Sequence, residues 1–314
     1  MNVLLGHAFV DSLEAGLVWA CVGLGVYLTF RILAFPDLTV EGSFPAGAAI
    51  AAAIIFRGGH PIVGTLLAIA GGMVAGAATG LLHTRRKIND ILSGILVASA
   101  LYSVNLLIMD RPNTPLLGKV TVYEEVYSLL GVSGGSWPRI ALLLVITAGL
   151  ALLLNWFLHT DLGLAIRATG SNPSMAQGLG IRTDNLKILG LMLANGLVAL
   201  SGALTAQLQG FADISMGVGT LVVGFAAVII AEAVFGVNRM IWNLLAVLAG
   251  SFAYRFIVAI ALLLGLPSTQ LKLIASVLVV LTLGISLPKL RERIGLPLLP
   301  SHRRPSPAAA GEAR

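Results

Sequence analysis

Residues 61–82 read PIVGTLLAIAGGMVAGAATGLL and carry no charged side chain. About 20 consecutive apolar residues form a helix long enough to cross the hydrocarbon core of a bilayer. Gly72, Gly76 and Gly80 recur at intervals of four residues and therefore lie on one face of such a helix. In lipid, helices approach one another most closely through small residues. The stretch predicts a membrane-spanning helix with a smooth glycine stripe that contacts another helix.

The composition extends this interpretation to nearly the whole chain. Of its 314 residues, 57% are hydrophobic and only 11% are charged, whereas a soluble domain carries about 25% charged residues. A soluble chain this apolar has too few polar side chains to cover its surface, so lipid must be its solvent. Eight runs, including the first, are long enough to span a bilayer: 12–33, 61–82, 88–109, 138–159, 186–208, 218–236, 240–265 and 270–287.

A further apolar run, 44–56, has only 13 residues and is too short to cross alone. It follows a polar segment, residues 35–43, that reads FPDLTVEGS. Either the two pieces form one span that is broken in the middle, or the short run enters the membrane and returns. The sequence leaves both alternatives open. It therefore predicts an all-α polytopic membrane protein with 8–9 transmembrane helices, one of them broken or re-entrant near residues 35–56.

Basic residues orient these spans, because loops rich in Lys and Arg stay in the cytoplasm. Thirteen of the 20 lie in loops 83–87, 160–187 and 237–239 or after residue 287, against five on the other side. This places the 160–187 loop and the C-terminus in the cytoplasm. We expect residues 1–287 to form one transmembrane domain. Residues 288–314, rich in Pro, Ala and Arg, are expected to be a disordered basic cytoplasmic tail.

The chain lacks the residue patterns of several common functions. No Gly-x-x-x-x-Gly-Lys-Ser/Thr loop is present, so the chain does not bind ATP in that manner. The five histidines lie mostly in loops and form no His-Glu-x-x-His pattern, so we expect neither catalytic residues nor a metal site. The net charge of +6 comes from basic residues dispersed between apolar runs, which argues against nucleic-acid binding.

The longest cytoplasmic loop contains signals for a short helix. Asn172 can cap free N–H groups, Pro173 suits the first helical position, and Gly180 ends the helix. The resulting helix, 173–179, has at most two turns and is too short to be stable alone. We expect it to lie at the membrane surface and to dock into a partner. The alternative is a simple interfacial turn.

This loop resembles the coupling segment of the permease subunits of ATP-binding cassette importers, in the group of branched-chain amino acid and ribose permeases. Residues 37–43 and 195–204 resemble two further elements of that group, and their spelling is closest to a poorly characterised branch linked to amino acids of tryptophan or tyrosine type. The resemblance covers roughly residues 15–287. The residues of the loop that match the pattern are Gly163, Arg167, Ala168, Gly170, Asn172, Ala176, Gly180 and Ile181.

The resemblance implies the working parts of an importer in the bacterial cytoplasmic membrane. A separate ATPase would dock on residues 161–181 and bind the ATP, so this chain, which would not be an enzyme, would hold no cofactor itself. A second permease copy would complete the pore, and an extracytoplasmic binding protein would deliver a small solute, preferably an amino acid. The residues expected to couple to the ATPase are Arg167, Ala168, Gly170, Asn172, Pro173, Ala176, Gln177 and Gly180.

A secondary active transporter that works without an ATPase is the alternative. Such transporters usually show repeated halves and ionisable relays at the membrane midplane. This chain shows one deep arginine, Arg255, and no clear repeat. The residue pattern therefore favours the importer subunit.

Polar groups inside the membrane are costly and indicate function by default. A turn that faces the pore is one interpretation of residues 37–43, and an interfacial loop that caps the next helix is the other. Asn195 suits a hydrogen bond between helices, whereas Arg255 lies about 22 Å deep and needs a carboxylate, a wet cavity or an anionic substrate group. We expect Glu232 to reach the interface or to pair with Arg239. The candidate pathway residues are Asp37, Thr39, Glu41, Ser43, Asn195 and Arg255.

Overall fold

The computed structural model describes residues 2–131, 135–235 and 239–265, together with residues 273, 276, 277 and 280. In this part of the chain there are eleven α-helices, which confirms the all-α class. The long helices are α1 (Asn2–Val26), α3 (Pro61–Arg86), α4 (Asp90–Met109), α6 (Ser136–Leu158), α9 (Thr183–Gln209) and α11 (Met240–Leu263). The shorter helices are α2 (Val40–Phe56), α5 (Val122–Leu130), α7 (Asp161–Ser171), α8 (Pro173–Gly178) and α10 (Thr220–Phe235).

Four small elements complete the described fold. A π-helical turn, η1 (Tyr27–Ile32), continues α1, and a 3-10 turn, η2 (Ile214–Gly217), precedes α10. Strand β1 (Asn113–Pro115) pairs antiparallel with β2 (Phe211–Asp213), with Thr114 opposite Ala212. The two strands lie in connections that the apolar pattern treats as loops, because a three-residue strand leaves no periodic signal.

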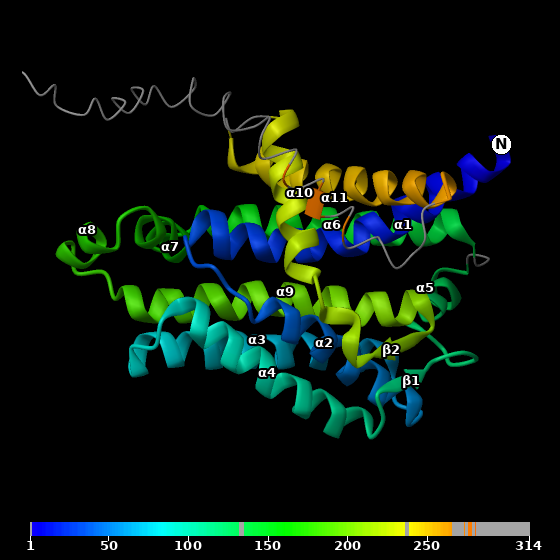
Figure 1. Cartoon of the computed structure of the whole chain (residues 1–314), viewed down its shortest axis with the longest axis horizontal. Helices are drawn as coiled ribbons and strands as arrows, with labels where there is room; N and C mark the ends of the chain where they lie inside the picture. Colours follow the sequence, from blue (N-terminus) through cyan, green and yellow to red (C-terminus); the bar gives the residue numbers. More distant parts are fainter. Residues whose placement is uncertain are drawn as a thin grey trace, which may run out of the picture.

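The helices form two layers that meet along α1 and α9 (Figure 1). Helix α9 packs most extensively against α3 and α2, and α4 covers that side of the bundle. Helix α1 packs against α11, α9, α10 and α6 on the other side. These two helices are also the most buried of the long apolar helices, with 78% of the apolar window of α1 and 72% of that of α9 inside the described structure.

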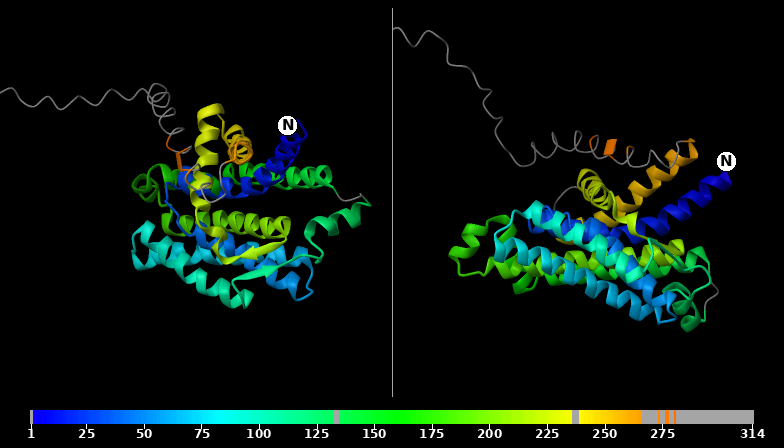
Figure 2. Two further views of the ribbon diagram at one scale, coloured as in Figure 1. Left: turned by 45° about the vertical axis from the view of Figure 1, so that its right-hand side comes forward. Right: turned by 60° about the horizontal axis from the view of Figure 1, so that its bottom comes forward.

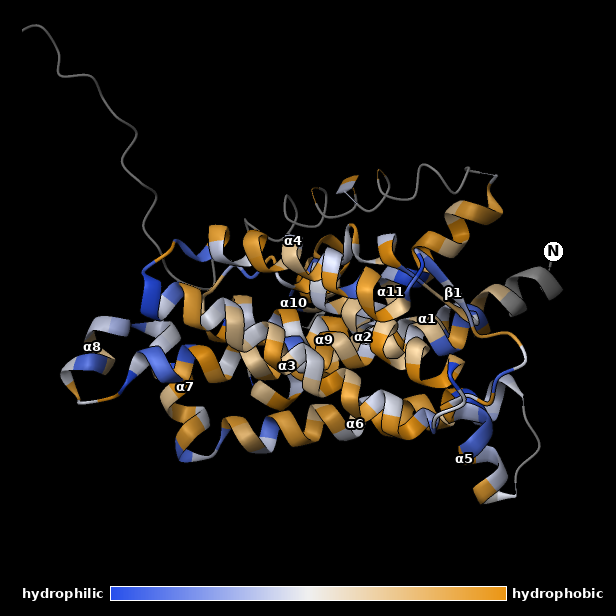
Figure 3. Cartoon of the chain, turned by 90° about the horizontal axis from the view of Figure 1, so that it is seen from below, coloured by the Kyte–Doolittle hydropathy of each residue, from blue (hydrophilic) through white to orange (hydrophobic). Residues whose placement is uncertain are grey.

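The two ends of the bundle differ in what they carry (Figures 1 and 2). We call them the α7–α8 end and the β1–β2 end. Hydrophilic residues gather at both ends, and the helices between them are mostly hydrophobic (Figure 3). The basic loop 83–87 and the 160–187 loop lie together at the α7–α8 end, whereas α5 and the start of α1 lie at the β1–β2 end (Figure 1).

Seven helical segments of the described chain are long and apolar enough to cross a bilayer. They begin and end within a few residues of the first seven predicted spans: Ala8–Ile32, Pro61–Arg86, Asp90–Met109, Ser136–Leu158, Thr183–Gln209, Ile214–Glu232 and Met240–Leu263. The eighth predicted span, 270–287, and the predicted tail, 288–314, lie almost wholly outside the described residues.

The short run 44–56 is part of a longer path. Helix α2 begins at Val40 and has 17 residues. Before it, the chain leaves η1 beside α7, where the backbone of Ile32 abuts Gly170. After it, Arg57 pairs with Asp110, at the end of α4, with an N–O distance of 3.1 Å. The irregular segment 33–39 and α2 together therefore lead from the α7–α8 end to the β1–β2 end (Figure 1).

The glycine stripe of α3 faces α9, as predicted. A Cβ atom at Gly72 or Gly76 would collide with the backbone carbonyl of Asn195 or Leu191, and one at Gly80 would lie 2.8 Å from the Cα of Ile188. The three glycines thus let the two backbones approach over two helical turns. Close approach of two helices through small residues is typical of helix packing in lipid.

Replacing Gly76 tests this contact. Gly76→Ala should destabilise the protein by about 1–3 kcal/mol, because overpacking forces the backbones apart. Gly149→Ala in α6 is the matched control, since nothing lies within 4 Å of a Cβ atom there. Thermal unfolding in detergent measures both. Equal melting temperatures for the two variants would show that α3 and α9 tolerate a wider spacing.

Candidate functional site

Helices α7 and α8 are built by local capping. Thr160 Oγ1 accepts a hydrogen bond from the N–H of Gly163 at 3.3 Å and so caps α7. Asn172 Oδ1 accepts from the N–H of Met175 at 3.0 Å, and Pro173 occupies the first position of α8. Gly180 then has a φ of +82°, a left-handed conformation that glycine adopts without strain. The predicted start of this helix is confirmed, and its end falls at Gly178, one residue early.

Helix α8 projects from the end of the bundle with most of its surface free (Figure 1). Ala176 is the only buried residue of this helix. Met175 is 64% exposed and Leu179, just after the helix, is 70% exposed. These two apolar side chains are four residues apart and lie on the same face. The projection thus offers an apolar contact that the described chain does not cover.

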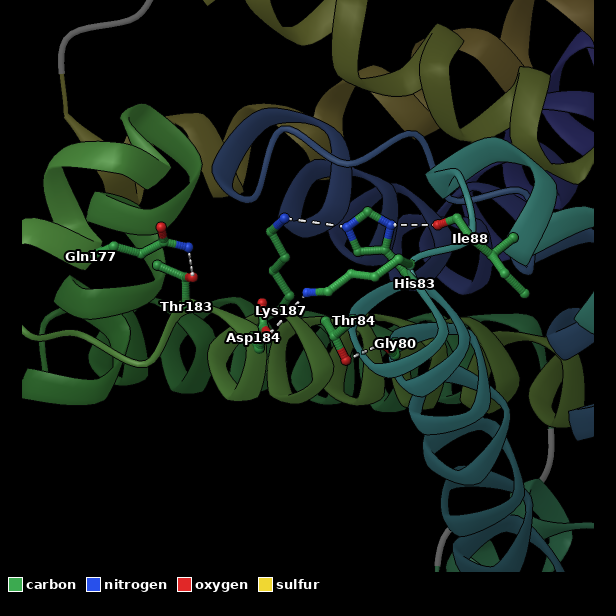
Figure 4. A network of polar contacts seen from close by, with 9 residues as sticks. Gly80, His83, Thr84, Ile88, Gln177, Thr183, Asp184 and Lys187 are labelled. Carbon is green, nitrogen blue, oxygen red and sulfur yellow. Dashed lines mark hydrogen bonds and ion pairs between the residues drawn. The ribbon is translucent and has the colours of Figure 1, made fainter.

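A polar network fixes the base of this projection (Figure 4). Gln177 Nε2 donates to Thr183 Oγ1 at 2.9 Å, which ties α8 to the start of α9. Lys87, after α3, pairs with Asp184 at 3.6 Å. Lys187 Nζ lies 3.3 Å from Nε2 of His83, and the other ring nitrogen of His83 lies 3.0 Å from the carbonyl oxygen of Ile88. The start of α9 is therefore held to the α3–α4 turn.

The residues predicted to couple to an ATPase separate into two groups. Asn172, Pro173, Gln177 and Gly180 are exposed on or beside α8, around the buried Ala176. Arg167, Ala168 and Gly170 instead lie on α7 and line a cavity that also touches η1 and the start of α11. The structure thus brings only the first group to the projecting tip.

Four of the predicted pathway residues form one buried network where α2 begins. Asn195 Nδ2 donates to Asp37 Oδ2 at 2.6 Å, and Asn195 Oδ1 accepts from Ser43 Oγ at 2.5 Å. Asp37 Oδ1 accepts the backbone N–H of Thr39 at 2.9 Å, and Thr39 Oγ1 lies 2.6 Å from Thr79 Oγ1. All of these side chains are at most 2% exposed. They join α2, α3 and α9 inside the chain.

Glu41 differs from its neighbours because it reaches a cavity. The cavity has a volume of about 540 Å³ and lies between α2, α4 and the segment around η2. Glu41 Oε1 accepts the N–H of Gly219 at 3.1 Å, so this carboxylate also fixes the start of α10. The other polar residues of the lining are Ser99, Tyr102, Asn105 and Ser215.

Comparison with known proteins now identifies the chain. Residues 8–283 match the family described as branched-chain amino acid transport system, permease component. This chain belongs to that family. It is a permease subunit of an ATP-binding cassette importer and a multi-pass membrane protein, and it is not an enzyme. Membership of such a transport system implies a separate ATPase, which hydrolyses the ATP, and a binding protein as partners.

Individual relatives agree with the family. The permease is 41% identical over 290 residues to the tyrosine transport system permease protein of Clostridioides difficile, covering 91% of this chain and 95% of that one. It is 35% identical to an uncharacterized protein of Rickettsia prowazekii, covering 90% and 98% of the two chains. A solved structure, PsaBC from Streptococcus pneumoniae in complex with Fab, shares the fold with a TM-score of 0.50 at 15% identity, covering 93% of this chain and 95% of that one.

Arg255 lies apart from the other pathway candidates of the permease. Its guanidinium carbon sits 4.2 Å from the centre of the Trp19 ring, a cation–π contact between α11 and α1. Among the described residues its Nε atom has no hydrogen-bond acceptor. The predicted pairing of Glu232 with Arg239 is wrong, because Glu232 pairs with Arg31 at 2.9 Å. Sequence spacing did not reveal that η1 brings Arg31 beside α10.

Sequence reasoning about the permease missed the α4 side of the Glu41 cavity. Ser99 and Tyr102 of α4 line it and, like Ser103, are exposed. Their spacing of three and four residues places them on one face of the helix. That spacing was available in the sequence, but short hydroxyl side chains barely lower the hydropathy of a span and so gave no separate signal.

We expect the buried network around Asn195 to contribute to the stability of the permease. Asn195→Ala removes the donor to Asp37 Oδ2 and the α9 acceptor of the Ser43 hydroxyl, and an unsatisfied buried polar group costs about 1–3 kcal/mol. Ser103→Ala, on the exposed face of α4, is the control and should change stability little. Thermal unfolding of the purified permease measures the difference. A melting temperature of Asn195→Ala that matches the control would mean that the network contributes nothing to the fold.

Proposed function

We propose that this permease passes an amino acid inward and that a separate ATPase drives it by docking on α7 and α8. The single observation that carries the proposal is the projecting α8 (Figure 1), which exposes the apolar side chain of Met175 and, just after the helix, that of Leu179. An apolar helix face in a groove is a recurrent mode of recognition between proteins. The network between α8, α9 and the α3–α4 turn would pass movement of the docked helix to α9.

The proposed orientation places the α7–α8 end in the cytoplasm. The three basic residues 85–87 and Arg167, Arg182 and Lys187 gather at this end, and cytoplasmic loops are rich in such residues. The N-terminus would then lie outside the cytoplasm. Segment 33–39 and α2 would together make one broken crossing rather than a re-entrant hairpin. With 270–287 as a span, the permease would cross nine times and end in the cytoplasm.

The proposed pathway runs along the face that α2, α4 and η2 share. Glu41, Ser99, Tyr102 and Ser215 reach the surface there, whereas exposed residues of α6 such as Leu152 are apolar. A carboxylate that faces lipid would be costly, so this face needs water or a second permease copy against it. Two copies facing each other would enclose a polar route. Arg255 and the network at Asp37 would support the helices that line it.

An amino acid is the proposed substrate. The tyrosine transport system permease of Clostridioides difficile shares 41% of its residues with this chain over nearly its full length. Glu41 is the one charged residue in the lining of the cavity. Its carboxylate would attract the ammonium group that every amino acid carries. The binding protein would hand over the substrate at the β1–β2 end.

The docking claim is tested by adding charge to the apolar tip. Met175→Asp with Leu179→Asp should reduce co-purification of the ATPase about tenfold or more, since each buried anchor of an interface is worth over about 1 kcal/mol. Leu129→Asp, an equally exposed leucine of α5 at the β1–β2 end, is the control. Full retention of the ATPase by the double variant would remove α8 from the interface. Uptake that continues without any ATPase would favour a secondary transporter.

The pathway claim is tested at Glu41. Glu41→Gln keeps an oxygen to accept the N–H of Gly219 but removes the charge. Amino-acid uptake into proteoliposomes that also hold the ATPase should fall about tenfold. This corresponds to a loss of about 1.4 kcal/mol of attraction between the carboxylate and the substrate ammonium group. ATPase co-purification should stay unchanged. Asp11→Asn, an exposed carboxylate of α1, is the control, and equal uptake by both variants would place the route elsewhere.

A further inference from the structure

A second polar cavity lies at the α7–α8 end and is separate from the Glu41 cavity. Its volume is about 680 Å³. Three elements enclose it: the end of α1 with η1, helix α7, and the beginning of α11. Its polar lining consists of Tyr27, Arg31, Arg167, Ser171, Arg239 and Asn243.

The cavity is strongly basic. Three arginines line it, and the only carboxylate that pairs with one of them in the described structure is Glu232, on Arg31. Arg167 and Arg239 form no ion pair among the described residues. Asn243 Nδ2 donates to the Tyr27 hydroxyl at 3.3 Å, and this hydrogen bond joins η1 to α11. The lining thus holds an excess of positive charge and donors that suit an anion with several oxygen atoms.

Exposed apolar side chains lie in the lining of the cavity or next to lining residues in the sequence. Leu164, which lines it, is 47% exposed. Trp242 is 60% exposed and adjoins Asn243, and Phe30, which adjoins Arg31, is 46% exposed. Exposed tryptophan beside arginine is typical of the boundary between the hydrocarbon core and the head groups. A ligand here meets charge in the cavity and apolar side chains beside it.

We propose that this cavity binds the phosphate head group of an anionic phospholipid, with the acyl chains along Leu164, Phe30 and Trp242. Arg167 and Arg239 supply the charge, and Tyr27 and Asn243 lie within the same lining. Basic pockets between membrane helices at the cytoplasmic side bind anionic head groups in this manner. A free phosphate would bind the arginines but would make no use of the exposed apolar side chains of Leu164, Phe30 and Trp242.

The site gives Arg167 a role distinct from direct contact with the ATPase. A lipid phosphate between Arg167 on α7 and Arg239 before α11 would bridge the coupling loop to the bundle. Helix α7 already abuts η1 at Gly170 and Ile32. The lipid would therefore hold the base of the α7–α8 projection in place while α8 remains exposed.

Lipid selectivity of the full-length permease tests the site, and the measurement requires no transport. The permease is mixed with an equimolar mixture of phosphatidylglycerol and phosphatidylcholine in detergent, and native mass spectrometry counts the lipids that stay bound. Wild type should retain phosphatidylglycerol preferentially. Arg167→Gln with Arg239→Gln should lower that preference about 25-fold, since each basic residue near a head group is worth about fivefold. A parallel arm replaces the lipids with inorganic phosphate.

Two further variants keep the outcome interpretable. Arg182→Gln removes an exposed arginine at the same end but outside the cavity and should keep the preference. Arg167→Lys with Arg239→Lys keeps the charge and should retain most of it, which separates lost charge from misfolding. No preference in wild type, or the same preference in the glutamine variant, overturns the proposal. If the glutamine variant loses the ATPase but keeps its bound lipid, the proposal is overturned and the cavity belongs to the protein partner. If wild type binds inorganic phosphate but shows no preference for phosphatidylglycerol, the cavity binds a free anion.

Discussion

Within a bilayer, every backbone N–H and carbonyl group must find its partner inside the protein, and this constraint dictates the rest of the structure. Continuous helices satisfy it without help. Segment 33–39 does not, because there the chain leaves η1 and is irregular until α2 begins. The N–H of Phe35 returns to the carbonyl of Thr29 at 2.9 Å, and Asp37 accepts the N–H of Thr39. The break survives because Asn195 Nδ2 donates to Asp37 and Asn195 Oδ1 accepts from Ser43.

This network explains why α9 lies at the centre. Asn195 reaches α2 from α9, and the glycine stripe of α3 lets α3 meet the same stretch of α9. The polar contact of Asn195 and the close backbone contact with α3 thus both hold α9. Since α9 begins at the network that anchors α8, the helix tied to the proposed ATPase contact is also the helix that holds segment 33–39 through Asp37.

The two cavities divide the proposed work of the permease. The Glu41 cavity lies where α2 and α10 begin, so a shift of either helix would reshape it. The arginine cavity lies where α7 meets η1 and α11, between the projecting tip and the bundle. Neither is formed by one element alone. Each therefore responds to movement between elements, which suits a subunit whose role is conformational rather than chemical.

The sequence by itself determined the long apolar helices and the start of α8. Apolar length placed seven membrane helices to within a few residues, Asn172 and Pro173 placed the start of α8, and the spacing of Gly72, Gly76 and Gly80 identified the packed face of α3. These signals are local, since hydropathy, capping and helical period depend on neighbours in the chain.

Only the tertiary structure decided which distant groups meet. Asp37 and Asn195 are 158 residues apart, and the Arg31–Glu232 pair replaced the expected pairing with Arg239 because η1 carries Arg31 to α10. The family pattern in the 161–181 loop reads as one motif, yet α7 turns Arg167 into a cavity while α8 turns Met175 outward. No local rule separates them, because the direction of each side chain depends on how its helix packs against the others.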